Sequence, residues 1–266
     1  MHSLINCGVP RANPGVAEYP ASRRNAPTSP GIRIRLLGAC VLVLGICTPA
    51  LAEQGPPQGG GPYRASDLVE LIKLDPTIKL DIRYATTNNF VGRAMYSEPR
   101  AFLQRPAAMA LLAVQRRLKG QGYGLVIFDA YRPWSVTKLF WDVTPPDKRI
   151  FVADPAVGSV HNRGCAVDLG LYELRTGREI DMPGAYDETS ERSFVTYPGG
   201  TPDQRAHRDL LRKAMERDGL FFVLPEEWWH FDYKDYMDYA IQNIPFSAIH
   251  ASAASALPKK SATGDR

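Results

Sequence analysis

Hydrophobic and polar residues alternate regularly along residues 166–172, AVDLGLY. In a strand with a two-residue period, Val167, Leu169 and Leu171 share one face and Asp168 faces the other way. The residues beside the acid on that second face are small, so nothing crowds its carboxylate. The pattern predicts a strand that covers a core on one side and presents an acid to a site on the other.

Other segments carry the patterns of helices and buried strands. Residues 106–119 begin with a proline and stop before Gly120, as a capped helix does. An apolar run within 123–133 fits a buried strand, and Thr201 with Gln204 forms a capping box at the start of a further helix. The remaining expectations are the end of that helix at Gly219, a short helix or strand at 68–74, a strand at 78–85, a helix at 135–143 capped by Ser135, and two strands on either side of Pro225.

Strands and helices alternate irregularly and finish in a hairpin-like pair. This order predicts one mixed α+β domain with a mainly antiparallel sheet flanked by helices. We place the domain at residues 63–246, after a Gly/Pro/Gln-rich linker at 53–62. Residues 247–266 lack sustained periodicity and are expected to be disordered.

The first 52 residues have the composition of a leader. Arg33 and Arg35 precede an apolar run from Leu36 to Cys47, and a small-residue stretch ends at Ala52. A basic flank, a short apolar core and an Ala-x-Ala end predict a signal peptide cleaved after Ala52, although a buried helix is the alternative. The run is too short to span a bilayer comfortably, so we expect an exported, periplasmic protein with no stable membrane insertion after cleavage.

Charge and cysteine usage follow the same division. The chain has a net charge of +4, and the five arginines and one acid of residues 1–52 account for all of it. The remainder is formally neutral and has no basic stripe, which argues against a nucleic-acid partner. Of the four cysteines only Cys165 lies beyond the leader, so the domain has no internal disulfide. Its place on the apolar side of the strand predicts a buried, structural residue.

Two histidines and an acid are the strongest candidate chemistry. His161 lies in the turn before the strand that carries Asp168. From that segment alone, a metal ligand and a loop histidine bonded to Asp168 are equally supported. His230, in the segment PEEWWHFDY, favours the metal, because two histidines and one aspartate suit zinc with a water in the fourth position.

A catalytic zinc site also needs a base and a group that stabilises the oxyanion. Glu226 and Glu227 are the candidate bases, and Pro225 places them in a turn from which Glu227 can reach the metal. The two tryptophans that follow can exclude water and raise the pKa of the glutamate. Arg132 ends a buried strand, where an oxyanion contact and a salt bridge to Asp129 are equally open.

Three motifs in order, DAYRP, SVHNRGCAVD and EWWH, resemble those of D-alanyl-D-alanine dipeptidases of the vancomycin-resistance type. These are zinc D,D-peptidases of a hedgehog-like group, and the resemblance covers roughly residues 63–240. It implies one Zn²⁺ per chain, Glu227 as general base and acid, and Arg132 as the residue that stabilises the transition state. The implied zinc ligands are His161, Asp168 and His230. The implied pocket residues are Ser159, Asp187, Tyr84 and Phe90, with Asp187 pairing with the ammonium of the substrate.

The resemblance implies hydrolysis of the small dipeptide D-Ala-D-Ala to two D-alanines. The leader is a departure, because the resistance-type enzymes are usually cytoplasmic, and it favours breakdown of wall-derived dipeptide over resistance. A D,D-carboxypeptidase acting on longer wall peptides would need an open groove where we expect residues 173–200 to close the pocket. A zinc-binding module without catalysis would need neither Glu227 nor Arg132. The oligomeric state is left open.

Overall fold

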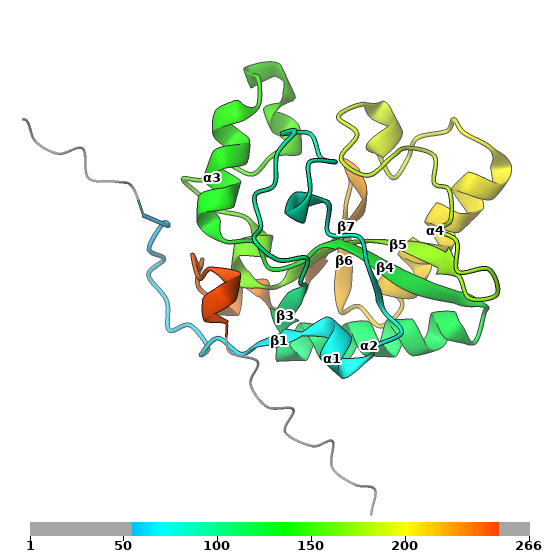
Figure 1. Cartoon of the computed structure of the whole chain (residues 1–266), viewed down its shortest axis with the longest axis horizontal. Coiled ribbons are helices and arrows are strands. Elements are labelled where there is room, and N and C mark those ends of the chain that lie inside the picture. Colours follow the sequence, from blue (N-terminus) through cyan, green and yellow to red (C-terminus); the bar gives the residue numbers. More distant parts are fainter. Residues whose placement is uncertain (1–54, 250–266) are drawn as a thin grey trace, which may run out of the picture. The chain divides into compact units, whose positions relative to one another are not determined.

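The structure is a computed structural model that describes residues 55–249, so the predicted leader and most of the predicted tail lie outside the described residues. Its centre is a five-stranded sheet in the order β2-β4-β5-β7-β6 (Figure 1). The pairs β4–β5, β5–β7 and β6–β7 are antiparallel and only β2–β4 is parallel. The predicted α+β class with a mainly antiparallel sheet is confirmed. The strands of this sheet are β2 (Lys79–Leu80), β4 (Tyr123–Asp129), β5 (Ala166–Glu173), β6 (Phe221–Leu224) and β7 (Glu227–Tyr233).

Two long helices pack against the sheet and against each other. Helix α2 (Arg105–Lys119) contacts β4, and α4 (Pro202–Glu216) contacts β6 (Figure 1). The buried side chains of α2 include Ala107, Leu111 and Leu118, which recur at helical spacing and put one apolar face on the sheet. The helix predicted at 106–119 is therefore confirmed.

The remaining elements surround this core. Strands β1 (Leu68–Glu70) and β3 (Phe102–Gln104) form a separate antiparallel pair, and α1 (Leu71–Leu74) follows β1 directly. Helix α3 (Trp134–Val143) follows β4. Six short 3-10 helices complete the described elements: η1 (Arg83–Ala85), η2 (Pro146–Phe151), η3 (Val160–Arg163), η4 (Glu191–Ser193), η5 (Tyr236–Asp238) and η6 (Phe246–Ala248). No helix within 55–249 is long and apolar enough to cross a membrane.

The capping box of α4 forms as predicted. The Thr201 hydroxyl accepts the backbone N–H of Gln204 at 3.1 Å, and the Gln204 side chain accepts the N–H of Thr201 at 2.9 Å. The C-terminal end of α4 was predicted at Gly219, but the helix ends at Glu216. Gly219 belongs to a separate left-handed turn with φ of 62°. The buried, structural position predicted for Cys165 is also confirmed, and burial raises the pKa of its thiol to about 12.

Three local predictions were wrong. The strand expected at 78–85 lasts two residues, because the chain turns into η1 and buries Tyr84. Ser135 does not cap α3, which begins one residue earlier after Pro133. The ordered fold continues past the boundary placed at 246, because η6 follows and Ile249 is buried in the core.

Candidate active site

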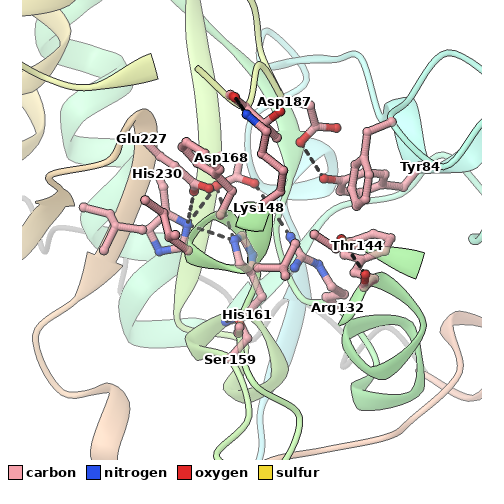
Figure 2. Close-up of a pocket in the computed structure, with 18 of the residues that line it drawn as sticks. Tyr84, Arg132, Thr144, Lys148, Ser159, His161, Asp168, Asp187, Glu227 and His230 are labelled. Atoms are coloured by element: carbon pink, nitrogen blue, oxygen red, sulfur yellow. Dashed lines mark hydrogen bonds and ion pairs between the residues drawn. The ribbon is translucent and has the colours of Figure 1, made fainter. Parts of the chain in front are cut away.

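The three residues predicted as metal ligands meet at one place on the sheet. Asp168 in β5 lies directly opposite His230 in β7, and His161 belongs to η3, just before β5. Nε2 of His161 lies 3.1 Å from Nδ1 of His230 and 3.3 Å from Oδ1 of Asp168 (Figure 2). Nδ1 of His230 lies 3.0 Å from the same oxygen, and all three side chains are buried. One ligand atom from each residue therefore points into a common space.

The outer ring nitrogens of both histidines face acceptors. Nδ1 of His161 lies 2.6 Å from the carbonyl oxygen of Ala130, and Nε2 of His230 lies 2.9 Å from Oδ1 of Asp232. With the ring protons on these outer nitrogens, both inner nitrogens carry lone pairs. Two lone pairs 3.1 Å apart beside a carboxylate repel one another unless a cation lies between them.

The dimensions of this triangle suit a metal ion. Its edges of 3.0, 3.1 and 3.3 Å are close to the ~3.3 Å that separates ligand atoms around a tetrahedral zinc with bonds of ~2.0 Å. Among residues 55–249 it is the single group of three or more His, Cys, Asp or Glu side chains that could hold a metal. The residues present therefore fit a divalent metal ion.

A tight turn holds His161 in place. The Ser159 hydroxyl accepts the backbone N–H of His161 at 3.2 Å, and the Asn162 side chain accepts the N–H of Ser159 at 2.8 Å. Gly164 ends the turn with φ of 71°, where a Cβ would lie 2.4 Å from Cδ2 of Leu68. Only glycine fits this position without strain, so the spacing between His161 and β5 depends on it.

An irregularity in β7 brings Glu227 to the same place. Val223 pairs with Phe231, but the next residue, Leu224, pairs with Glu227, so several residues of β7 bulge out of register. The bulge removes the strict alternation that would put Glu227 and His230 on opposite faces. Oε2 of Glu227 lies 3.8 Å from Nδ1 of His230.

The environment of Glu227 favours its protonated form. Burial raises the pKa of this carboxyl group to about 8, and the neighbouring His230 opposes that shift. Trp229 lines the same cavity and Glu226 does not. Of the two candidate bases, the geometry favours Glu227.

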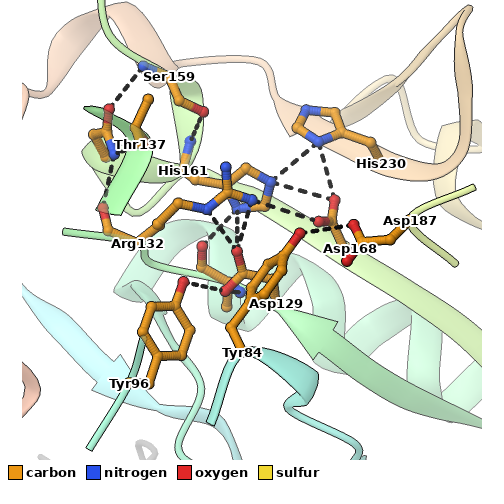
Figure 3. A network of polar contacts seen from close by, with 12 residues as sticks. Tyr84, Tyr96, Asp129, Arg132, Thr137, Ser159, His161, Asp168, Asp187 and His230 are labelled. Carbon is orange, nitrogen blue, oxygen red and sulfur yellow. Dashed lines mark hydrogen bonds and ion pairs between the residues drawn. The ribbon is translucent and has the colours of Figure 1, made fainter. Parts of the chain in front are cut away.

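Arg132 makes the salt bridge to Asp129 and still faces the site. Its Nε and Nη2 atoms donate to Oδ2 of Asp129 at 2.9 and 2.8 Å (Figure 3). Nη2 lies 3.8 Å from Oδ2 of Asp168. The guanidinium is packed over the rings of Phe140 and Tyr84, at 4.8 and 5.4 Å from their centres. The two roles that the sequence left open are compatible, because the salt bridge aims the cation into the cavity.

Asp129 is fully occupied by these contacts. Oδ1 accepts the hydroxyl of Tyr96 at 2.8 Å and the backbone N–H of Ala130 at 2.9 Å, while Oδ2 takes both contacts from Arg132. Four donors on one buried carboxylate leave it little freedom, so Asp129 fixes the direction of the guanidinium.

Asp187 lies in the long irregular segment before α4 and also faces the cavity. Its backbone has φ of 64°, which is unusual for a residue other than glycine. Oδ1 accepts the hydroxyl of Tyr84 at 2.7 Å, while Oδ2 is buried without a hydrogen-bond partner. Burial raises the pKa of Asp187 to about 7. An unpaired buried carboxylate oxygen at a cavity wall is suited to a cationic ligand group.

The other predicted pocket residues line the same cavity. Tyr84 is buried against Phe140, with ring centres 4.7 Å apart. Phe90 is 41% exposed and packs on Phe140 at 4.9 Å between ring centres. Ser159 is buried, and its hydroxyl is held by the turn described above.

The cavity is larger than the small closed pocket expected from the sequence. Its volume is about 920 Å³, which is in the upper range of pockets that hold drug-sized ligands. Lys148 and Ile150 of η2 form part of its wall, and no sequence pattern indicated them. No sequence pattern indicated Tyr186, which donates to Oδ2 of Asp168 at 3.1 Å, and Asp232 was not among the predicted site residues. Asp232 had a detectable signal, because it follows His230 by two residues in a predicted strand.

The chain is similar in sequence to known proteins of one family. The chain matches the family described as D-Ala-D-Ala dipeptidase over residues 64–249. A D-alanyl-D-alanine dipeptidase of Escherichia coli (strain K12) is 34% identical over 184 residues, which cover 69% of this chain and 93% of that protein. One from Enterococcus faecalis is 34% identical over 172 residues, which cover 58% of this chain and 85% of that protein.

Among solved structures, the vancomycin-resistance D,D-dipeptidase VanXYg in complex with a D-Ala-D-Ala phosphinate analogue is 22% identical, with a TM-score of 0.33 over 52% of each chain. The family match covers more than half of the chain and includes every residue of the site. This chain is therefore a peptidase of the M15 group and belongs to the D-Ala-D-Ala dipeptidase family.

Proposed function

We propose that this chain hydrolyses D-Ala-D-Ala to two D-alanines, with one Zn²⁺ held by His161, Asp168 and His230. The proposal rests on the set of residues that line one cavity. It contains a buried triangle of metal-ligand atoms, the Glu227 carboxyl group beside them with its side chain 14% exposed, and an unpaired carboxylate oxygen on Asp187. A metal site, a base and an anchor for an ammonium group are the parts that cleavage of a small free dipeptide requires.

A zinc ion in this site supplies Lewis-acid chemistry, which makes water acidic and polarises a carbonyl group. Glu227 takes the proton from the attacking water as the new C–O bond forms at the scissile carbonyl. Arg132, held by Asp129, stabilises the negative charge that develops on the carbonyl oxygen. Glu227 then gives the proton to the leaving amine as the C–N bond breaks. A carboxyl pKa raised by burial suits this role, because the group must both accept and return a proton.

The carboxylate of Asp187 orients the substrate. Oδ2 of Asp187 binds the ammonium group of the dipeptide, while the Tyr84 hydroxyl holds Oδ1 in place. Tyr84 also packs beside Arg132, so the ammonium anchor and the oxyanion contact share one wall.

A D,D-carboxypeptidase that trims longer peptides is the second candidate. The cavity volume of about 920 Å³ favours it, because a dipeptide does not need this much room. A zinc-binding module without catalysis has less support, since Glu227 and Arg132 both line the cavity and a purely structural site needs neither.

The test is D-alanine release by the zinc-loaded chain from three substrates: D-Ala-D-Ala, its N-acetylated form, and a longer wall peptide that ends in D-Ala-D-Ala. Turnover of the free dipeptide alone would support the dipeptidase, because acetylation removes the ammonium that Asp187 binds. Turnover of the longer peptide would support the carboxypeptidase. Stoichiometric zinc binding without turnover of any substrate would support the metal site and contradict both proposed activities.

The KM for D-Ala-D-Ala is expected to rise in acid. Burial raises the pKa of Asp187 to about 7, so the carboxylate is present above that pH and is lost by protonation below it. Because the neutral acid cannot pair with an ammonium group, KM should increase by up to about tenfold per pH unit below the pKa. Steady-state kinetics between about pH 5.5 and 8.5 measure this. The D187N variant should have a raised KM without this acid limb, and a limb of unchanged shape in the variant would assign the titration to another group.

We also propose that residues 1–52 form a signal peptide cleaved after Ala52, and that the enzyme acts on wall-derived dipeptide in the periplasm. The proposal is supported by the basic flank at Arg33 and Arg35, the apolar run that follows, and the Ala-x-Ala end. N-terminal sequencing of the protein from a periplasmic fraction tests it. A mature chain that begins at Glu53 is the expected result.

A further inference from the structure

Asp232 lies behind His230, on the side of the imidazole that faces away from the other two proposed ligands. Both residues belong to β7, where residues two apart share a face. Oδ1 of Asp232 lies 2.9 Å from Nε2 of His230, while Nδ1 of the same ring points at Asp168 from 3.0 Å. The ring therefore lies between two carboxylates and uses one nitrogen for each.

The surroundings of Asp232 leave this contact without competition. Among residues 55–249, His230 is the only side chain that forms a hydrogen bond or ion pair with the Asp232 carboxylate. Its partner across the β5–β7 pairing is Ala166, whose small side chain leaves room for the carboxylate to turn towards the imidazole. The Asp232 side chain is 25% exposed.

The two histidines of the site are supported differently. The outer nitrogen of His161 forms its hydrogen bond with a neutral acceptor, the carbonyl oxygen of Ala130 at 2.6 Å, and lies 3.9 Å from Oδ2 of Asp129. The outer nitrogen of His230 meets a charged acceptor, which holds the N–H more strongly and makes the opposite nitrogen a better electron donor. The bond also fixes which nitrogen carries the proton and therefore which one is free for a metal.

We propose that Asp232 is a positioning residue of the metal centre: its carboxylate accepts the Nε2–H of His230 and so presents Nδ1 to the metal ion. The inference rests on the metal site proposed above. It adds a residue outside the three proposed ligands that acts on the affinity for the ion through His230. Removing such a carboxylate is expected to lower metal affinity by about 10–100-fold.

The test is the zinc dissociation constant of the full chain, measured by competition with a chromophoric chelator. D232A should bind zinc about 10–100-fold more weakly than the wild-type protein. D232N should lose less, because its amide oxygen can still accept the Nε2–H without the charge. Nitrogen NMR of the histidine rings gives an independent readout, since loss of the acceptor should allow Nδ1 and Nε2 of His230 to share the proton in the metal-free protein.

D235N is the matched control. It removes the same charge shortly after β7, and the side chain of Asp235 pairs with Lys234 and not with His230. Zinc affinity in D235N should be unchanged, and the metal-free forms of all variants should unfold at similar temperatures. Unchanged affinity in D232A, or equal losses in D232A and D235N, would overturn the proposal. Failure of the wild-type protein to bind zinc would instead contradict the proposed metal site itself.

Discussion

The E227Q variant is expected to lose almost all turnover of D-Ala-D-Ala while it retains its metal. The amide has nearly the shape of the carboxylate but cannot take a proton from water, and general-base catalysis contributes about 10²–10⁴-fold to rate. Oε2 of Glu227 lies 3.8 Å from Nδ1 of His230, so the carboxyl group is beside the ligand triangle and not part of it. Measurement of kcat by D-alanine release, with metal content of the same sample, tests both halves of the expectation.

The adjacent acid provides the control. Glu226 carries the same functional group and does not line the cavity, so E226Q should keep kcat close to that of the unchanged chain. If E226Q were inactive and E227Q active, the assignment of the base would be reversed. Loss of zinc from E227Q would show that Glu227 is a ligand.

The position of Glu227 beside His230 could not be predicted from the sequence pattern. An alternating strand would have put Glu227 and His230 on opposite faces, and the turn predicted at Pro225 was the only local sign of another arrangement. The actual cause is a register shift between β6 and β7. Both strands lie within residues 221–233, but the order of apolar and polar residues does not show where the ladder between them shifts.

The metal triangle combines a local and a non-local feature. Two-residue alternation in 166–172 correctly predicted a strand, β5, with Asp168 away from its apolar face. That Asp168 lies opposite His230 follows from the β5–β7 pairing of segments 62 residues apart. Local pattern therefore predicted the orientation of Asp168, whereas the distance between Asp168 and His230 depends on strand pairing that no single segment shows.

The pocket was the least predictable part of the site. Asp187 lies outside any strand or helix, and its positive φ has no signal in the sequence, so only the resemblance to dipeptidases pointed to it. Residues 187–189 of the expected closing segment line the cavity, and so do Lys148 and Ile150 of η2, which no sequence pattern indicated. The prediction that Ser135 caps α3 was wrong for a non-local reason as well. The backbone N–H of Ser135 donates to the side chain of Asn243, which is distant in the sequence, at 2.9 Å.

The D168N variant is expected to lose both metal and activity. Asp168 is the one charged residue among the three proposed ligands, and its Oδ1 lies 3.0 Å from Nδ1 of His230 and 3.3 Å from Nε2 of His161. Exchange for an amide removes the negative charge that offsets part of the charge of a divalent ion. The loss of zinc affinity should therefore exceed the ~10–100-fold typical of residues behind the ligands.

Tyr186 allows this effect to be separated from a general disturbance of the site. Its hydroxyl donates to Oδ2 of Asp168 at 3.1 Å, on the oxygen that does not face the histidines. Y186F should therefore lose no more than the ~10–100-fold in zinc affinity typical of residues behind the ligands, and less than D168N, because the charge of the Asp168 carboxylate is kept. Full activity of D168N at low zinc would contradict the ligand assignment. An equal loss of zinc in Y186F and D168N, with both proteins folded by circular dichroism, would instead place the effect in the shape of the cavity, because the charge of Asp168 is intact in Y186F.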